Sequence, residues 1–86
     1  MTADVKALMI DMVDNFTTTQ LEALLMELAI VYNPIVKYGS ENKWLIEAEG
    51  EIAEVSSASI IFYLLIECGT EEGLLLEAVL RSSIIE

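Results

Sequence analysis

The chain has 86 residues, and its 15 Asp and Glu residues against 4 Lys and Arg residues give it a formal charge of −11 at pH 7. This charge excludes binding to nucleic acid through the phosphates, because that affinity comes from Lys and Arg side chains that displace counterions. The absence of histidine removes the commonest general base and the commonest ligand of transition metals. The length predicts a single acidic helical domain over residues 1–86, and the hydrophobic content of 55% excludes intrinsic disorder.

The chain shows no signal for export or for membrane insertion. Asp4 comes before the first lysine, unlike the basic start of a secretory signal peptide. The longest apolar run, residues 60–66, is far shorter than the roughly 18 residues that a membrane-spanning helix needs. Cys68 is the only cysteine, which excludes an internal disulfide and fits a reducing compartment. We therefore expect a cytoplasmic protein that does not interact with membranes.

Two amphipathic helices are expected in the first part of the chain. Apolar residues recur at helical spacing over residues 5–16 and again over residues 21–32. Thr19, followed three positions later by Glu22, predicts a capping box at the start of the second helix. Pro34 is expected to end this helix, because proline disfavours helical geometry in the residue before it.

Two interpretations remain open for residues 34–55. Between Trp44 and Ile52 apolar residues or glycine occupy the even positions and glutamates occupy most odd ones, a period of two that is typical of a half-buried strand. Residues 35–38 are the expected antiparallel partner, across a loop at residues 39–42. A small β-hairpin is the preferred interpretation. The alternative is one or two short helices, the first capped by Asn33 and begun by Pro34, and the second capped by Ser40.

Two more helices are expected towards the C-terminus. Serines beginning at Ser56 open the first, whose body over residues 58–68 is apolar on nearly every side and is therefore predicted to be buried all round. Gly69 is expected to end that helix, and Thr70 is expected to begin the last one. The predicted fold class is mainly α, a compact four-helix domain with a small β-hairpin inserted between the second and third helices.

Apolar residues exceed what one core-facing stripe on each helix requires. The surplus lies on the helices predicted after residues 19, 55 and 70. A second copy of the chain is the simplest way to cover such a surplus, since two-fold homodimers are the commonest closed assembly. We therefore predict a homo-oligomer. The alternatives are a tightly bound partner of a different kind and a compact fold that covers these residues internally.

The carboxylates do not form a recognisable catalytic or metal-binding motif. The densest acidic run, residues 47–54, lacks the residue spacing of a calcium-binding loop and has no histidine or nucleophile motif beside it. We therefore expect no enzymatic activity, no cofactor and no metal site.

The acidity and the apolar surplus together predict a small protein-binding module that acts stoichiometrically on a basic partner. One form of this hypothesis is an inhibitor that mimics the charge of nucleic acid and blocks a nucleic-acid-binding enzyme, and small acidic inhibitors encoded by phages are similar to this chain in size and charge. The alternative is a self-assembling structural or assembly subunit that uses the apolar faces of the third and fourth helices. The candidate partner-binding residues are Glu41, Trp44, Glu47, Glu49, Glu51 and Glu54, with Asp11 and Asp14 as a second group.

Overall fold

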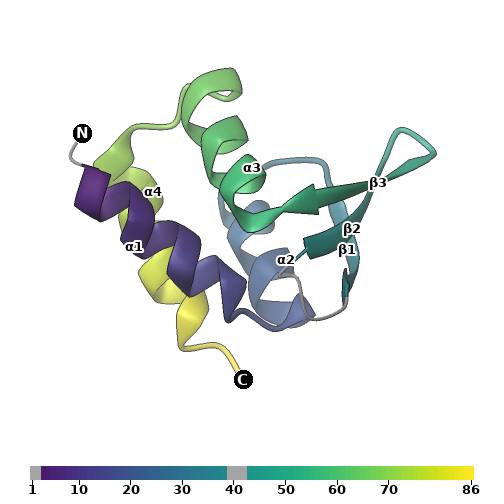
Figure 1. The fold of residues 1–86 in the computed structure, drawn as a ribbon, viewed down its shortest axis with the longest axis horizontal. Helices are drawn as coiled ribbons and strands as arrows, with labels where there is room; N and C mark the ends of the chain where they lie inside the picture. Colours follow the sequence, from purple (N-terminus) through teal and green to yellow (C-terminus); the bar gives the residue numbers. More distant parts are fainter. Residues whose placement is uncertain (1–2, 39–42) are drawn as a thin grey trace.

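The computed structural model, which describes residues 3–38 and 43–86, combines four helices with a three-stranded antiparallel sheet (Figure 1). The helices are α1 (Ala3–Asp14), α2 (Thr18–Glu27), α3 (Ser57–Phe62) and α4 (Glu72–Ser83), and a π-helical segment, η1 (Tyr63–Glu67), continues α3. The strands are β1 (Asn33–Tyr38), β2 (Lys43–Ala48) and β3 (Glu51–Ser56), with β2 in the centre. The expectation of a compact, mainly helical domain is therefore confirmed in its coarse form, whereas the sheet makes the fold mixed α and β.

The hairpin interpretation of residues 34–55 is confirmed, and the short-helix alternative is wrong. β1 pairs with β2 in antiparallel orientation, and the expected loop at residues 39–42 lies outside the described residues. The expected single strand over residues 44–52 is also wrong, because the chain reverses at Glu49 and Gly50. Both turn residues have positive φ, 53° and 81°. This two-residue turn starts a third strand, β3, which pairs with β2.

Helix α2 begins and ends earlier than the sequence pattern suggests. Its N-cap is Thr17, whose side chain accepts a hydrogen bond from the backbone of Gln20, while the Gln20 side chain accepts one from the Thr17 backbone. The capping box predicted at Thr19 is therefore wrong, because glutamine fills the third helical position as well as glutamate does. Ala29, with a φ of 58°, follows the last turn of α2, and Pro34 lies in β1 instead of ending the helix.

The third predicted helix is buried on one side only, which corrects the expectation that it is buried all round. Ile60, Ile61 and Leu64 are buried, whereas Phe62 and Ile66 are 39% and 71% exposed. The ring of Phe62 instead lies beneath the ammonium group of a lysine on α1, 4.8 Å from the ring centre. α1 and the sheet cover only part of the surface of this helix, so its remaining apolar side chains stay exposed. Exposed apolar residues are common on folded proteins.

The ends of this helix and of α4 are partly as expected. Ser56 is the N-cap of α3, since its hydroxyl accepts a hydrogen bond from the backbone of Ser59 at 3.1 Å. Gly69, with a φ of 63°, follows the end of η1 as predicted. Thr70 does not cap α4, because the N-cap residue is Glu71, which makes no side-chain capping bond.

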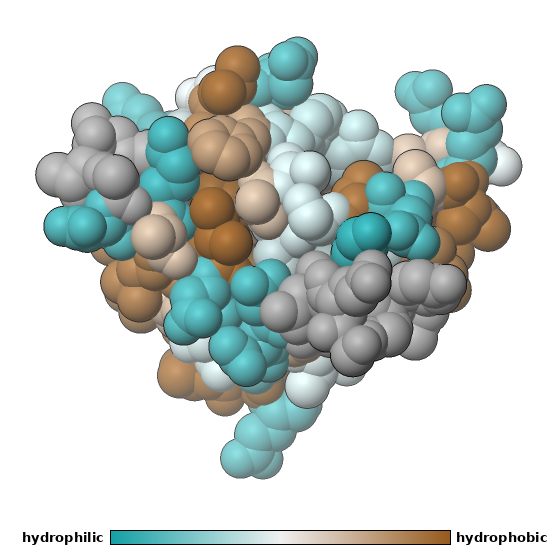
Figure 2. All heavy atoms as spheres, viewed as in Figure 1, coloured by the Kyte–Doolittle hydropathy of each residue, from teal (hydrophilic) through white to brown (hydrophobic). Residues whose placement is uncertain are grey.

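The core lies between the helices and the inner face of the sheet. It contains the buried residues Met9, Val13, Phe16, Leu21, Leu24, Leu25, Trp44, Ile46, Ile60, Ile61, Leu64, Leu75, Ala78 and Val79. The accessible surface of 5167 Å² is close to the value of about 5,000 Å² expected for a folded monomer of this mass. The chain is thus as compact as an ordinary small domain. Even so, hydrophobic residues reach the surface at several separate places (Figure 2).

None of the described helices is both long enough and apolar enough to span a membrane.

Candidate functional site

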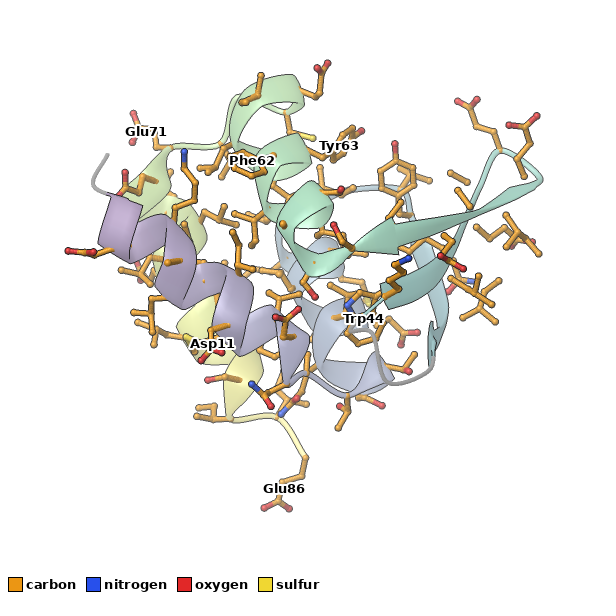
Figure 3. All side chains as sticks on the ribbon, viewed as in Figure 1. Asp11, Trp44, Phe62, Tyr63, Glu71 and Glu86 are labelled. Carbon is orange, nitrogen blue, oxygen red and sulfur yellow. The ribbon has the colours of Figure 1, made fainter. Side chains whose placement is uncertain are left out.

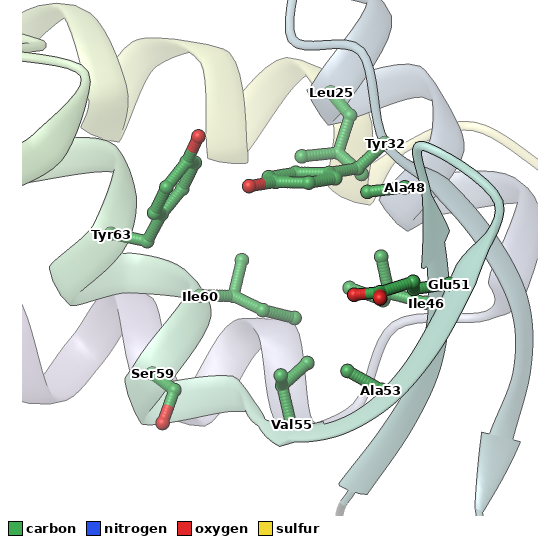
Figure 4. Close-up of a pocket in the computed structure, with 10 residues that line it drawn as sticks. All are labelled: Leu25, Tyr32, Ile46, Ala48, Glu51, Ala53, Val55, Ser59, Ile60 and Tyr63. Atoms are coloured by element: carbon green, nitrogen blue, oxygen red, sulfur yellow. The ribbon is translucent and has the colours of Figure 1, made fainter.

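An apolar pocket of about 350 Å³ lies between the sheet and the helices (Figure 4). Its lining residues are Leu25, Tyr32, Ile46, Ala48, Glu51, Ala53, Val55, Ser59, Ile60 and Tyr63. Strands β2 and β3 form one wall, α3 and the first residue of η1 form the opposite wall, and residues from and just after α2 close one end. The volume is at the lower end of the range of roughly 300–1,000 Å³ that is typical of ligand pockets.

The register between β2 and β3 explains why these strand residues line the pocket. Ala48 lies opposite Glu51, and Ile46 lies opposite Ala53, so alternate residues of both strands share the inner face of the sheet. The two alanines of this wall, Ala48 beside the turn and Ala53 in β3, are small, whereas the facing helix contributes the larger Ile60. The pocket is therefore the space that two short side chains leave between the sheet and α3.

Two tyrosines lie side by side in the lining of the pocket, which also includes Glu51 and Ser59. The rings of Tyr32 and Tyr63 are 5.1 Å apart between centroids and tilted by 57°, and their hydroxyl groups point towards each other at one end of the pocket (Figure 4). Hydrogen bonding with Tyr32, and then with the thiol of Cys68, raises the pKa of Tyr63 above its ordinary value near 10. A tyrosine hydroxyl can both donate and accept hydrogen bonds, so these two hydroxyls are polar groups that a ligand could meet at that end of the pocket.

The outer edge of β3 has no neighbouring strand within residues 3–38 and 43–86. The two residues that flank a two-residue turn, here Ala48 and Glu51, form a hydrogen-bonded pair. Along the antiparallel ladder, hydrogen-bonded pairs then alternate with pairs that are not hydrogen-bonded. The backbone groups of Glu51 and Ala53 thus face β2. The N–H and C=O groups of Ile52 and Glu54 point away from the sheet, beside the pocket.

The structure places the predicted carboxylates of the hairpin on different sides. Glu47 and Glu54 lie on the outer face of the sheet, Glu49 lies in the turn, and Glu51 lies on the inner face at the pocket. A continuous strand would have placed Glu47, Glu49 and Glu51 on one face, and the turn at Glu49 and Gly50 separates them instead. Lys43 on β2 pairs with Glu54 at 3.2 Å. All four carboxylates remain exposed, whereas Trp44 of the same hairpin lies between the sheet and the helices (Figure 3).

The other predicted partner-binding residues do not join this group. Asp11 and Asp14 lie on α1, which is on the opposite side of the molecule from the β2–β3 turn (Figure 1). Trp44 is fully buried and donates a hydrogen bond from Nε1 to the buried hydroxyl of Ser57 at 3.1 Å, so its predicted role as an exposed partner anchor is wrong. Glu41 lies outside the described residues.

Within the part of the chain that the structure describes, no three Cys, Asp or Glu side chains are grouped so that they could hold a metal ion.

The sequence interpretation missed the residues that form the pocket. Ala53, Tyr32 and Tyr63 belong to three separate segments, and no local pattern links them. One signal was available. A continuous strand over residues 44–52 would place Gly50 in a row of core-facing residues, where glycine has no side chain to pack. A turn at Glu49 and Gly50 avoids this and places small or apolar residues from both sides of the turn on one face of the sheet.

No protein-family model, no characterised protein and no solved structure matches this chain. A function for it is therefore argued from the residues of its own site, since a fold by itself does not determine a function.

Proposed function

We propose that this chain is a small protein-binding domain that binds a basic segment of another protein and catalyses no reaction. The binding region, here called the hairpin site, consists of the pocket and the carboxylates of Glu47, Glu49, Glu51 and Glu54. The observation that carries the proposal is that an open apolar pocket, with Glu51 in its lining, lies on the inner face of a hairpin whose turn and outer face expose three more carboxylates. A partner segment with both basic and apolar side chains would satisfy both features of this site.

The two features of the hairpin site contribute differently to binding. Burial of one aliphatic side chain in the pocket stabilises a complex by roughly 1.5–3 kcal/mol. Exposed ion pairs contribute only about 0–1 kcal/mol each, but the long-range field of a strongly acidic protein accelerates encounter with a basic partner. The pocket therefore supplies affinity, and the carboxylates supply rate and selectivity.

Mimicry of nucleic acid is the narrower form of this proposal. In that form the hairpin carboxylates occupy the cationic groove of a nucleic-acid-binding enzyme and block it. Asp11 and Asp14 would not contact the same groove, because they lie on the far side of the domain. The mimic would thus rely on the hairpin carboxylates alone.

The test compares two variants with the same net charge. In the first, the hairpin variant, Glu47, Glu49, Glu51 and Glu54 become glutamine. In the control, the exposed Asp4, Glu22, Glu71 and Glu86, which lie away from the hairpin, become asparagine or glutamine. Each protein is immobilised, exposed to lysate of the host cell at low salt and eluted with increasing NaCl.

We expect the wild type and the control variant to retain one and the same basic protein, released at moderate salt, and the hairpin variant to lose it. Screening at higher ionic strength weakens attraction between exposed charges, which explains the salt dependence. Equal loss in both variants would show that net charge matters and the hairpin site does not. Equal retention by all three proteins would refute the proposal.

Self-assembly is the second candidate function. Helix α4 exposes Leu74 and Leu80, and Ile84 follows at its C-cap, all on the surface of the domain. Apolar contacts between copies would persist or strengthen as salt rises, unlike contacts through carboxylates. Light scattering at about 0.05 M and 0.5 M NaCl distinguishes the two, since a salt-resistant dimer favours assembly and a monomer favours a heterologous partner.

A further inference from the structure

We infer that the partner segment binds in extended form, as a fourth strand along the outer edge of β3, and places one apolar side chain in the pocket. This inference rests on the proposed function and adds to it the conformation of the partner. It also defines the partner's chemistry, an extended segment of basic and apolar residues.

The backbone of β3 is available for pairing. The outward N–H and C=O groups of Ile52 and Glu54 provide two donors and two acceptors at the spacing of an antiparallel or parallel partner. The side chain of Ile52 is 60% exposed, and no proline occurs in β3 to interrupt a ladder. Addition of a strand to an exposed sheet edge is a general mode of peptide recognition, in which main-chain hydrogen bonds give affinity and pockets give specificity.

The pocket lies where a side chain of such a strand would point. Neighbouring strands are about 4.8 Å apart, and alternate residues of an added strand share a face with Ala53 and Val55. That face is turned towards Ile60 and Tyr63 across the open part of the pocket (Figure 4). A residue paired with the middle of β3 therefore enters the pocket, which at about 350 Å³ has room for an aliphatic side chain.

The charges around β3 select a basic partner segment over a second copy of this chain. Pairing of two β3 edges would bring Glu51 and Glu54 of both copies together, and only Lys43, which already pairs with Glu54, would offset them. Like charges close together across a strand pair are destabilising. Lysine or arginine on the added strand would instead face Glu51 on the inner side or Glu54 on the outer side.

The first test uses synthetic peptides as the probe. Nine-residue peptides are selected on the immobilised protein from a random phage-displayed library and then measured by titration calorimetry in about 0.05 M NaCl. The selected peptides are then N-methylated at one position at a time. We expect at least a tenfold loss of affinity at alternate positions, where the peptide N–H pairs with β3, and little change at the positions between them.

The second test alters β3 itself. Ile52→Pro removes the outward N–H without removing a bond to β2, whereas Ile52→Thr keeps that N–H and the β-branched side chain. Ala53→Leu fills the pocket, and Ala7→Leu, on the exposed side of α1, is its matched control. We expect at least a tenfold loss of peptide affinity for Ile52→Pro and Ala53→Leu and less than a threefold change for the two controls.

Amide hydrogen exchange gives a readout inside the protein. On addition of the selected peptide, the amides of Ile52 and Glu54 should become protected, while those of Ala53 and Val55 are already protected in the free protein by their bonds to β2. If Ile52→Pro proves to be unfolded by circular dichroism, the N-methylated peptides and the exchange data decide, because both use the wild-type chain.

Each outcome separates the inference from the proposed function. Failure to select any peptide, uniform effects of N-methylation, or unchanged exchange at Ile52 and Glu54 would overturn strand addition. If the salt-dependent capture of a basic protein by the wild type, and its loss in the hairpin variant, are nevertheless observed, the proposed function stands with another mode of binding. If neither is observed, both are refuted.

Discussion

Gln20 connects the start of α2 to the C-terminal end of the chain through a single side chain. Its Oε1 accepts a hydrogen bond from the backbone of Thr17 at 2.8 Å, which completes the capping box. Its Nε2 donates to the carbonyl oxygens of Ser83 and Ile85, both at 2.9 Å. The amide group is needed for this arrangement, since it combines an acceptor with two donors.

Two substitutions at Gln20 separate these contributions. Gln20→Ala removes the acceptor for the Thr17 N–H and the bonds to the C-terminal residues, while the Thr17 hydroxyl keeps its bond to the backbone of residue 20, and it should lower the free energy of unfolding by about 2 kcal/mol. Gln20→Glu keeps the acceptor for Thr17 but has no donor for the two carbonyls, so it should cost about 1 kcal/mol. Urea unfolding followed by the fluorescence of Trp44 measures both. A Gln20→Glu protein as stable as the wild type would show that the bonds to Ser83 and Ile85 contribute nothing.

At the scale of elements, the turn between β2 and β3 determines the hairpin site. Both Glu49 and Gly50 have positive φ, the combination found in a tight two-residue hairpin turn whose twist matches that of the strands. A glutamate in this conformation is unusual, because side chains with a Cβ atom favour negative φ. The turn, and not the side chains of β3, therefore sets which residues face the pocket.

Substitutions at two glycines test this reasoning. A Cβ atom at Gly50 and one at Gly73 on α4 would both meet open space, with no atom within 4 Å. Gly50→Ala should nevertheless destabilise the protein by about 1–2 kcal/mol, because its φ is positive. Gly73→Ala should stabilise it by about 0.5–1 kcal/mol, because alanine favours a helix over glycine. Thermal unfolding measures the change in stability of each variant. A change in the same direction for both variants would contradict the argument from the backbone conformation of the two glycines.

At the scale of the whole molecule, the dominant feature is the unbalanced charge. The formal charge of −11 is spread over a domain with a radius of gyration of 11.8 Å, which is close to the screening length of about 10 Å at 0.1 M salt. Carboxylates on opposite sides therefore repel one another at low salt. Among the described residues, the ion pairs Arg81–Glu27, Arg81–Glu77 and Lys43–Glu54 offset only a small part of this repulsion.

Raising NaCl from about 0.01 M to 0.5 M should therefore stabilise the protein, by about 1–3 kcal/mol in the free energy of unfolding. Chloride is chosen instead of sulfate, because sulfate also strengthens the burial of apolar groups. The hairpin variant, with four fewer negative charges, should gain less from added salt. Urea unfolding at each salt concentration measures the effect. A loss of stability with NaCl would mean that the ion pairs outweigh the repulsion.

The sequence by itself determined the features that depend on local pattern. Helical periodicity located α1 and α2 to within a few residues, alternation located the strand at Trp44, and composition determined the acidity. These features follow from side-chain spacing along the chain, which is present before the chain folds. The ends of α2 were misplaced because several threonines and a glutamine or glutamate fit a capping box equally well.

Only the tertiary structure decided the features that depend on contacts between distant segments. In a continuous strand the even-numbered residues would all share the inner face. The turn at Glu49 and Gly50 puts the odd-numbered residues of β3 on that face instead, because side chains alternate with a period of two along a strand. The pocket is empty space between β3, α3 and Tyr32, and the free edge of β3 depends on what packs beside it. Trp44 likewise became a core residue, through the bond to Ser57 and the helices that cover the sheet.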